Sequence, residues 1–561
     1  MTARIVRITG TLAEAAPLRD AALADLVRVG PRGLLAEVIR FDGERAMLQV
    51  FEDTTGLALG AEIVTTGGSL AAELGPGLLG GIFDGVGRPL ARLADASGDF
   101  IAPGASIPTL DRATRWRFVA RAGRGDVVRT GSILGTVDEH GVEHRVLADR
   151  AGTIASIADA EVAVDEPFGT LVDGTPLVLL QTWPIRRPRP VAERLPADHQ
   201  LVTGQRVFDL LFPIAEGGTV AVPGGFGTGK TIVEHSLAKY ADADIVVFVG
   251  CGERGNEIAE VISDFRALVD PRTQRPMMER TVLVVNTSNM PVVAREASVA
   301  FGITIAEYFR DQGYRVAVMI DSLSRWAEAL RDIGARLQEM PGEEGYPTSM
   351  ASRLGAVFER AGRARVLGEP ARSGAVTLVS AISPPGGDFS EPVTQAALRV
   401  TGAVWALDAQ LARARQFPAV DWATSYSLYA VGDMAELRTR IIALLQRDAE
   451  LREVASLLGV EEMEDRDRLA LAIASLVREH VLGQNAFDPN DAMSSLAKTR
   501  DLASGALSAL DVATAALDHN RGLDELPLDA VRRAIAALRR ADPDGYAACH
   551  AEVLATIQRL A

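Results

Sequence analysis

The sequence predicts a mixed, multidomain fold: an N-terminal β-barrel, an inserted β-rich sandwich-like unit, a P-loop α/β domain of the RecA-like type and a C-terminal α-helical bundle. The hydrophobic pattern changes along the chain from short alternating runs to apolar runs separated by helical segments, and finally to helical spacing alone. The length of 561 residues also exceeds what one hydrophobic core usually serves. We therefore expect several structural units.

The composition excludes several classes of protein. A formal charge of -16 opposes sequence-independent binding to a phosphate backbone, so nucleic acid is not an expected partner. The two cysteines, Cys251 and Cys549, are too few for a disulfide framework, which fits a reducing cytosol. No apolar run is long enough to span a membrane, and the N-terminus lacks the apolar core of a signal peptide. If the protein works at a membrane, we expect another protein to anchor it there.

The first part of the chain predicts short antiparallel strands and then a connector. Alternating runs at residues 35–40 and 47–51 are interrupted by Gly and Asp, which indicates a small β-barrel over residues 1–68. Residues 69–112 form the connector, with a glycine-rich passage at residues 75–90 that we expect to be tightly turned. That passage could imitate a nucleotide loop. It lacks the Lys-Ser/Thr ending and no helix-like run follows it, so we expect it not to bind phosphate.

A second β-rich unit is expected over residues 113–182, where short apolar runs typical of strands are separated by residues typical of turns. Its spacing is similar to that of the small sandwiches that carry lipoyl or biotinyl groups. No lysine stands on the turn, so the unit is interpreted as a structural insertion. Three prolines in residues 183–190 block regular helix and favour an extended linker at a domain boundary.

Residues 183–430 predict a nucleotide-binding α/β domain, and residues 431–561 predict a helical domain. The first contains five short, almost wholly apolar runs of the buried parallel type, separated for the most part by helical segments. These runs are residues 219–222, 245–249, 282–285, 316–320 and 376–380. Beyond residue 431, leucine and isoleucine recur at helical spacing among charged residues. The acidic residues 461–465 are interpreted as a solvated turn, with contact to a partner as the alternative.

The strongest local motif lies directly after one predicted strand and before a predicted helix at residues 232–239. It matches G-x-x-x-x-G-K-[ST], in which backbone N–H groups wrap phosphates at the start of a helix. Lys230 is expected to reach the β- and γ-phosphate oxygens, and Thr231 offers a hydroxyl to Mg²⁺. The predicted nucleotide contacts are Gly224, Gly225, Phe226, Gly227, Thr228, Gly229, Lys230 and Thr231.

Two further strand ends carry acidic residues that suit ATP hydrolysis. Glu253 is the candidate for the carboxylate that activates water, and Arg254 for a charge near the γ-phosphate; a structural ion pair is the alternative. Glu257 follows one helical turn later and is interpreted as a neighbour. Asp321 ends the apolar run 316–320, which predicts a role in positioning Mg²⁺, through water.

These motifs, taken together, closely resemble the A subunit of vacuolar/archaeal-type rotary ATPases. The resemblance covers nearly the whole chain. The segments that carry it are residues 75–90, 224–231, 252–257, 321–331, 341–347, 383–394, 417–422 and 425–429, with Asp408. It identifies residues 113–182 as the insertion that distinguishes A subunits from their B partners. Phe226 favours the same assignment, since small residues fill that loop position in beta subunits of ATP synthases.

The resemblance implies a ring of three A and three B subunits with ATP/ADP sites at A–B interfaces. The B subunit would supply an arginine to each site, a central shaft would turn within the ring, and peripheral stalk subunits would complete the complex. Contact with the membrane sector would be indirect, on its cytoplasmic face. Family aromatics enclose the adenine, and Phe417 is the better match, with Phe487 weaker. The stretch 488–493, expected to be helical, lacks an aromatic that relatives would carry there.

The function expected from these residues is ATP hydrolysis or synthesis coupled to proton or sodium ion transport. A non-catalytic nucleotide-binding subunit is one alternative, but it would be expected to lack either Lys230 or Glu253, and both are present. A nucleic-acid translocase or protein-export ATPase is another, since both use a similar nucleotide domain. The inserted β unit and the acidic balance argue against it.

Overall fold

The computed structural model describes residues 3–98 and 101–561, and the chain divides into two compact units. The first unit comprises Met1–Pro196, Ala243–Ile382 and Ser390–Val400. The second comprises Ala197–Asp242, Ser383–Phe389 and Thr401–Ala561. The chain therefore passes from one unit to the other inside the region 183–430, and each unit is described separately.

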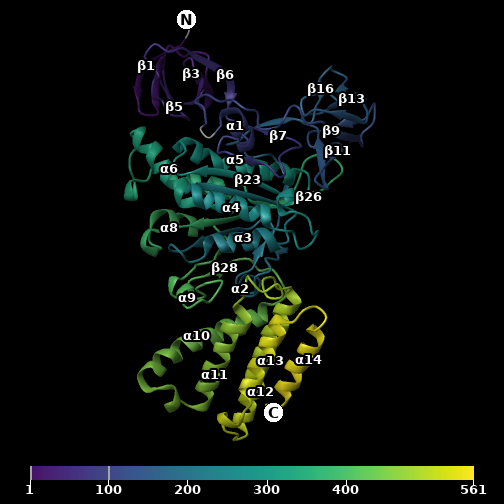
Figure 1. The fold of residues 1–561 in the computed structure, drawn as a ribbon, viewed down its shortest axis with the longest axis vertical. Helices are drawn as coiled ribbons and strands as arrows, with labels where there is room; N and C mark the ends of the chain where they lie inside the picture. The colour runs from purple at the N-terminus through teal and green to yellow at the C-terminus, as the bar shows by residue number, and fades with distance from the viewer. Residues whose placement is uncertain (1–2, 99–100) are drawn as a thin grey trace. The chain divides into compact units, whose positions relative to one another are not determined.

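The first unit begins with an antiparallel barrel, drawn in purple in Figure 1. Its strand order is β1-β2-β5-β4-β3-β6, and a bridge between Arg4 and Glu62 joins the first strand to the chain entering the last, which closes the sheet. Inward side chains such as Val27, Leu34 and Leu48 are fully buried. The strands are β1 (Arg4–Thr9), β2 (Leu12–Ala16), β3 (Asp25–Val29), β4 (Leu34–Asp42), β5 (Arg45–Val50) and β6 (Ile63–Ser69). The predicted barrel is confirmed.

The glycine-rich connector contributes a strand to the central sheet and leads into a helix. After β7 (Ala71–Leu74), the short strand β8 (Ile82–Phe83) adds in parallel to the edge of the central sheet. Helix α1 (Leu90–Ser97) follows, so the expectation that no helix comes after this passage was wrong. The helix has eight residues and buries only Leu93, which leaves too short a hydrophobic repeat to be detected beside so many glycines.

The inserted unit folds as two four-stranded sheets, in agreement with the prediction of a sandwich. Their orders are β10-β13-β15-β16 and β12-β11-β9-β14. Phe118 stacks on Phe168 with ring centroids 4.0 Å apart in its core. The strands are β9 (Trp116–Ala120), β10 (Val127–Val128), β11 (Ile133–Glu139), β12 (Val142–Leu147), β13 (Gly152–Ile157), β14 (Ala160–Val162), β15 (Gly169–Leu171) and β16 (Pro176–Leu177); β17 (Gln181–Pro184) then pairs with β7.

A parallel sheet with neighbours β26-β24-β22-β23-β8 forms the centre of the first unit. The four long strands contain four of the five predicted apolar runs, and their interiors are fully buried. They are β22 (Ile245–Glu253), β23 (Thr281–Thr287), β24 (Arg315–Asp321) and β26 (Ser373–Ile382), while β18 (Glu193–Leu195) and β25 (Gly362–Arg365) pair antiparallel at its side. The helices are α4 (Gly255–Ala267), α5 (Val292–Asp311), α6 (Leu323–Arg336), α7 (Met350–Phe358) and α8 (Pro392–Leu398).

The proline-rich linker is extended at its start, where β17 ends at Pro184, but residues 185–187 turn, with the N–H of Arg187 donating to the carbonyl of Pro184 at 3.1 Å. The prediction of an extended linker is therefore right only in part.

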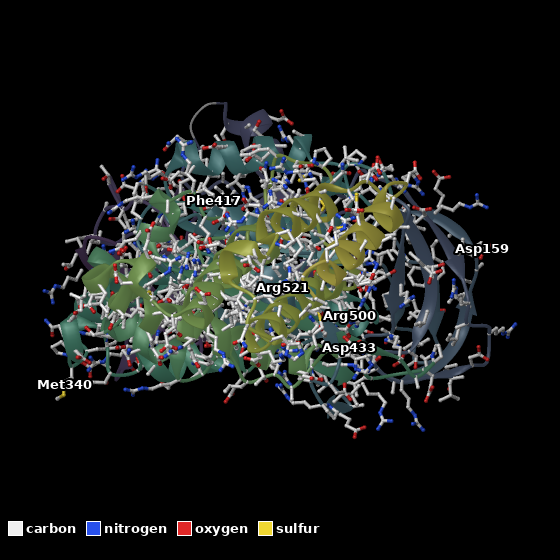
Figure 2. All side chains as sticks on the ribbon, turned by 90° about the horizontal axis from the view of Figure 1, so that it is seen from below. Asp159, Met340, Phe417, Asp433, Arg500 and Arg521 are labelled. Carbon is white, nitrogen blue, oxygen red and sulfur yellow. The ribbon has the colours of Figure 1, made fainter. Side chains whose placement is uncertain are left out.

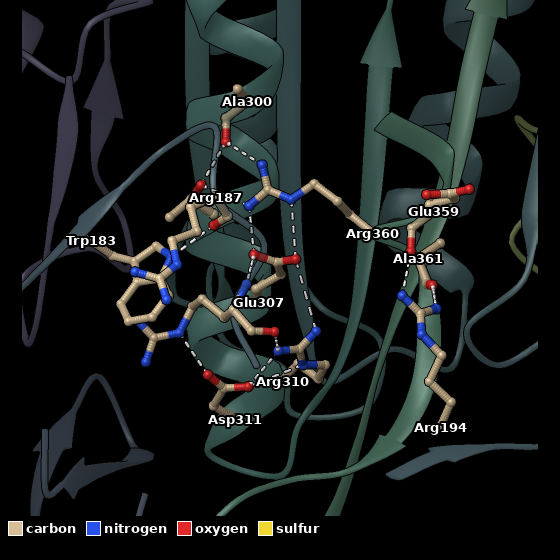
Figure 3. Close-up of polar contacts among 12 residues, drawn as sticks. Trp183, Arg187, Arg194, Ala300, Glu307, Arg310, Asp311, Glu359, Arg360 and Ala361 are labelled. Carbon is tan, nitrogen blue, oxygen red and sulfur yellow. Dashed lines mark hydrogen bonds and ion pairs between the residues drawn. The ribbon is translucent and has the colours of Figure 1, made fainter. Parts of the chain in front are cut away.

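Buried charges hold the linker on α5 (Figure 3). Arg189 Nε lies 2.6 Å from Asp311 Oδ2. Arg360 donates to the carbonyl of Ile185 at 2.7 Å and pairs with Glu307 at 2.5 Å. Because these carboxylates are largely withdrawn from water, loss of one partner would leave a buried charge uncompensated.

The second unit contains the strand-turn-helix that begins with β21 (Thr219–Pro223) and α3 (Lys230–Tyr240), and a helical bundle. Within this unit β21 pairs in parallel with β27 (Ala403–Val404), which pairs antiparallel with β28 (Tyr426–Ser427). Smaller elements are β19 (Gln200–Leu201), α2 (Arg206–Leu211), β20 (Ile214–Ala215) and α9 (Ala409–Arg413).

The predicted helical bundle consists of α10 (Ala435–Leu458), α11 (Asp465–Leu476), α12 (Leu496–Asp518), α13 (Leu528–Arg540) and α14 (Tyr546–Gln558). An ion pair between Arg500 and Asp433 ties α12 to the chain that precedes α10 (Figure 2). Of the acidic segment 461–465, the first two residues lie in a 3-10 turn (Val460–Glu462) and Asp465 begins α11. In the described part of the chain, every helix is too short or too polar to cross a membrane.

Candidate functional site

The predicted phosphate loop is a turn between β21 and the N-terminus of α3. Gly227 and Gly229 have φ of +75° and +90°, a backbone conformation that strongly favours glycine. Lys230 Nζ donates hydrogen bonds to the carbonyls of Gly224 (2.7 Å) and Gly225 (2.8 Å). The predicted strand-turn-helix context of the motif is therefore present.

The loop presents donors that suit an anion. The first N–H groups of a helix have no partner within the helix, and the helix dipole adds partial positive charge there. Lys230 adds a full charge at this position, and Thr231 follows in the same first turn. The Thr228 hydroxyl donates to the carbonyl of Gly225 at 2.9 Å, which stabilises the turn from within. Phe226 is 92% exposed.

A hollow in the second unit joins the phosphate loop to Phe417. The ring of Phe417 lies 3.9 Å from the place where a Cβ on Gly229 would stand. Gly229, the N-cap residue of α3, and Ile232 and Ser236 in that helix line the hollow, and Phe417 and Ala486 also line it. The hollow measures about 30 Å³, which is about the volume of one water, so a planar base would have to stack on the exposed part of the Phe417 ring rather than fill the hollow.

Phe487 lies next to the lining residue Ala486, but it is 96% exposed and does not itself line the hollow. Residues 488–493, expected to be helical, form turns instead, since Asp488 accepts the backbone N–H of Asn490 and thereby favours a turn. The structure thus brings Phe417, and not Phe487, to the phosphate loop.

Gln484 is a candidate site residue that the sequence analysis missed. It lines the same hollow, and its amide donates to the carbonyls of Gly204 (3.1 Å) and Asp491 (2.9 Å). Its own backbone N–H donates to the carbonyl of Phe417 at 2.8 Å, which fixes the segment that carries the aromatic ring. A single glutamine outside any motif gives no signal in a sequence.

In the first unit, the structure brings Glu253 and Asp321 to one edge of the central sheet. Glu253 ends β22 and Asp321 ends the neighbouring parallel strand β24, with Gly250 paired to Asp321. Gly252 has φ of +75° and marks a register shift in β22. A Cβ there would lie 2.8 Å from Cβ of Arg325, so glycine is required by space as well as by conformation.

Glu253 has the perturbed acidity expected of a general base. Burial, the charge of Asp321 and a hydrogen bond with Glu257 raise the pKa of Glu253 to about 7. A carboxyl group with this pKa exchanges a proton readily near neutral pH. Perturbed groups of this kind cluster at functional sites.

Arg254 and Glu257 lie at the start of α4. Arg254 is exposed and is the N-cap residue of the helix. Its backbone N–H donates to the carboxylate of Glu257 at 3.3 Å. Glu257 is thus a neighbour that caps the helix and perturbs Glu253, as expected, whereas the Arg254 side chain is exposed.

Arg325 is a second residue that the sequence analysis did not single out. It pairs with Glu328 at 3.0 Å, and its positive charge lowers the pKa of Glu253 against the larger effects of burial and Asp321. It occurs in the stretch 321–331, but sequence alone does not show which side chains of a helix lie beside a strand end.

The oxygen donors predicted to hold Mg²⁺ suit that ion chemically. Mg²⁺ prefers oxygen ligands and usually takes only one or two from the protein, with substrate phosphates and water completing its shell. Asp321 supplies a carboxylate at a strand end, 8% exposed, and Thr231 supplies a hydroxyl at a helix start.

Four family models match consecutive parts of the chain. They are the beta-barrel domain of the ATP synthase alpha/beta family (residues 5–67), the alpha/beta subunit barrel-sandwich domain (107–186), the nucleotide-binding domain of the same family (204–427) and the C-terminal domain of V and A type ATP synthases (426–519).

Relatives match almost the whole chain. A V-type ATP synthase alpha chain from Anaeromyxobacter dehalogenans is 51% identical, over 98% of this chain and all of its own. One from Thermoanaerobacter pseudethanolicus is 48% identical over 95% of this chain and 93% of its own. The A subunit of the A-type ATP synthase from Methanoculleus marisnigri is 50% identical over 88% of this chain and 87% of its own.

A solved structure shares the architecture at greater distance. The assembled ATPase EscN from the type III secretion system of enteropathogenic E. coli is 25% identical, with a TM-score of 0.65, over 90% of this chain and all of its own. The far higher identity to the synthase chains decides between the two families. This chain belongs to the family of V-type and A-type ATP synthase alpha chains, also called A subunits.

Proposed function

We propose that this chain makes and breaks the terminal phosphate bond of ATP as the catalytic subunit of a V/A-type rotary ATP synthase, and that Glu253 is its catalytic base. The observation that carries the proposal is the acidic pair at the sheet edge, in which burial and then the charge of Asp321 raise the pKa of Glu253 to about 7. A non-catalytic subunit would have no need of such a group in a chain that also carries an intact phosphate loop.

Lys230 is proposed to hold the triphosphate. The backbone N–H groups of residues 224–229 and the start of α3 would bind phosphate oxygens, together with the Lys230 ammonium. That ammonium now donates to the carbonyls of Gly224 and Gly225, so it would exchange these bonds for charge-assisted bonds to phosphate.

Glu253 is proposed to accept the proton of the attacking water as the water oxygen joins the γ-phosphorus and the bond to the β-phosphate oxygen breaks. In synthesis the same carboxyl returns that proton to the departing water. Arg254 is proposed to stabilise the negative charge that builds on the γ-phosphate oxygens.

Thr231 and, through water, Asp321 are the residues that would hold Mg²⁺. When bound, the ion neutralises charge on the phosphate oxygens. Phe417 is proposed to stack on the adenine, with Phe487 as a weaker contact that would act from the exposed side.

Membership of the family implies a complex with other synthase subunits. We propose that three copies of this chain alternate with three copies of a homologous B subunit, which supplies an arginine to each site. A central shaft and peripheral stalk would link the ring to a membrane sector that carries protons or sodium ions. The chain would thus lie on the cytoplasmic face of a membrane without entering it, and it would not bind nucleic acid.

The proposal is tested by reconstitution. The chain should assemble into a hexamer only with a homologous B chain, and the mixed ring should hydrolyse ATP far faster than the chain alone. Purification of the native complex into vesicles would then show whether ATP hydrolysis acidifies the lumen or requires sodium. A homohexamer of this chain that RNA stimulates would contradict the proposal.

A further inference from the structure

A pocket of about 390 Å³ lies within the first unit, between the barrel and helices α5, α6 and α7, and neither Glu253 nor a residue of the phosphate loop lines it. This volume lies within the range of small-molecule sites. The barrel contributes Val38 and Ile39, and the helices contribute Ile303, Trp326 and Val357. Trp326 is only 2% exposed, so one wall is a nearly buried aromatic ring.

The pocket lining carries three glutamates and three arginines, and the arginines are shared unevenly among the carboxylates. Glu37 from β4 and Glu296 from α5 share a single guanidinium, that of Arg186. Arg360 also lines the pocket, but its guanidinium is already bonded to Glu307. Arg353 at the rim stands 3.9 Å from Glu339. Once these pairs are formed, one carboxylate of the Glu37, Glu296 and Arg186 group has no cation of its own.

The same wall carries a hydrogen-bond acceptor without a donor. Gln49 from β5 is 1% exposed and lines the pocket. Its amide nitrogen donates to the hydroxyl of Thr11 at 2.8 Å, while its Oε1 has no hydrogen-bond partner among the described residues. Buried acceptors of this kind are uncommon, because an unmade hydrogen bond costs about 1–3 kcal/mol.

We propose that this pocket is a binding site for a small organic cation, an amidine or primary amine on a flat apolar body. Its N–H groups would bond Gln49 Oε1 and the carboxylate of Glu37, and its apolar body would lie against Trp326 and Val357. A neutral analogue would leave the shared carboxylate uncompensated, and an anion would be repelled by Glu37 and Glu296. The proposal goes beyond the proposed function and does not depend on it.

The test is isothermal titration calorimetry of the purified full chain with three probes of nearly equal shape: benzamidine, benzamide and benzoate. We expect one benzamidine per chain, at least tenfold weaker binding of benzamide and no binding of benzoate. Equal affinity for benzamidine and benzamide, or any preference for benzoate, would overturn the proposal.

Variants locate the site. Glu37→Gln removes the charge and Ala356→Trp fills the pocket from its exposed rim without touching the charges; each should weaken benzamidine at least fivefold. Glu44→Gln removes a carboxylate from an exposed ion pair on the same barrel and should change nothing. If Glu37→Gln fails to fold, Ala356→Trp alone decides, and unchanged affinity in that variant refutes the site.

Lys230→Ala separates this proposal from the nucleotide site. It should keep the affinity for benzamidine, because Lys230 is not part of the pocket. Loss of benzamidine binding in this variant would place the cation at the phosphate loop and overturn the proposal, whatever the outcome for ATP.

Discussion

Glu253 and Asp321 end neighbouring parallel strands of the central sheet, and next to burial it is the charge of Asp321 that most raises the pKa of Glu253, to about 7. Two carboxylates brought close together cannot both ionise easily. The arrangement of the sheet therefore gives Glu253 a pKa at which it can exchange a proton near neutral pH.

The first prediction concerns pH. Because Glu253 must be deprotonated to accept a proton, kcat/KM for ATP hydrolysis by the reconstituted ring should rise with pH through an apparent pKa near 7. Glu257→Gln removes a group that raises this pKa, so the rise should move to lower pH. A pH–rate profile checks both, and an unchanged profile in Glu257→Gln would show that another group sets it.

The same raised pKa has a defined sign in stability. The protonated form of Glu253 is favoured in the folded chain, so its contribution to stability is full below the ordinary carboxyl pKa and is lost as the pH rises through about 7. The Glu253→Gln variant cannot ionise and should therefore lose less stability than the parent between pH 5 and 8. Thermal melting of both at several pH values measures this difference.

The second prediction concerns the adenine. Phe417→Ala should weaken ATP binding by about tenfold, since stacking of an aromatic ring contributes about 1–1.5 kcal/mol. Binding of pyrophosphate should not change. Phe487→Ala is the matched comparison and should have the smaller effect, because that side chain is 96% exposed and does not line the hollow. An equal loss in both variants would place the adenine differently.

The third prediction concerns the turn that aims Glu253. Gly252→Ala should abolish most turnover while the chain still folds, because a Cβ at φ +75° would collide with Cβ of Arg325 and Cδ of Arg295. The strain should cost about 1–3 kcal/mol. Gly255→Ala, three residues on and with open space around it, is the control and should retain activity.

The fourth prediction concerns the buried charges beside the linker. Glu307→Gln should lower the free energy of unfolding by about 3 kcal/mol or more, since it leaves the buried Arg360 without a carboxylate. Asp518→Asn breaks an exposed pair with Arg466 and should cost less than about 1 kcal/mol. Urea unfolding of both variants makes the comparison, and similar midpoints would show that the linker network adds little.

The sequence was sufficient for the parts of the site that depend on local pattern. Buried parallel strands such as β22 and β24 can be recognised in the sequence because they are almost wholly apolar. Parallel strands place their carboxyl ends at one edge of the sheet, so the proximity of Glu253 and Asp321 could be predicted. The phosphate loop is likewise a local motif.

Tertiary packing accounts for what could not be predicted. Strand β8 has two residues and exists because β23 offers it a partner. Arg325 affects the pKa of Glu253, and Gln484 donates to the carbonyl of Gly204; both partners are distant in sequence. Neither Arg325 nor Gln484 belongs to a motif whose spacing predicts its role. Phe417 was recognised by resemblance, and only the structure shows its ring beside Gly229.

The central claim is that Glu253 activates water at the nucleotide held by Lys230 and Thr231. It is tested most directly by measuring ATP binding and ATP turnover of Glu253→Gln in the reconstituted ring, with Glu260→Gln on the exposed side of α4 as the control. We predict nearly unchanged ATP affinity, turnover reduced by at least about 100-fold, and full activity in the control. Turnover in Glu253→Gln equal to that of the control would contradict the claim.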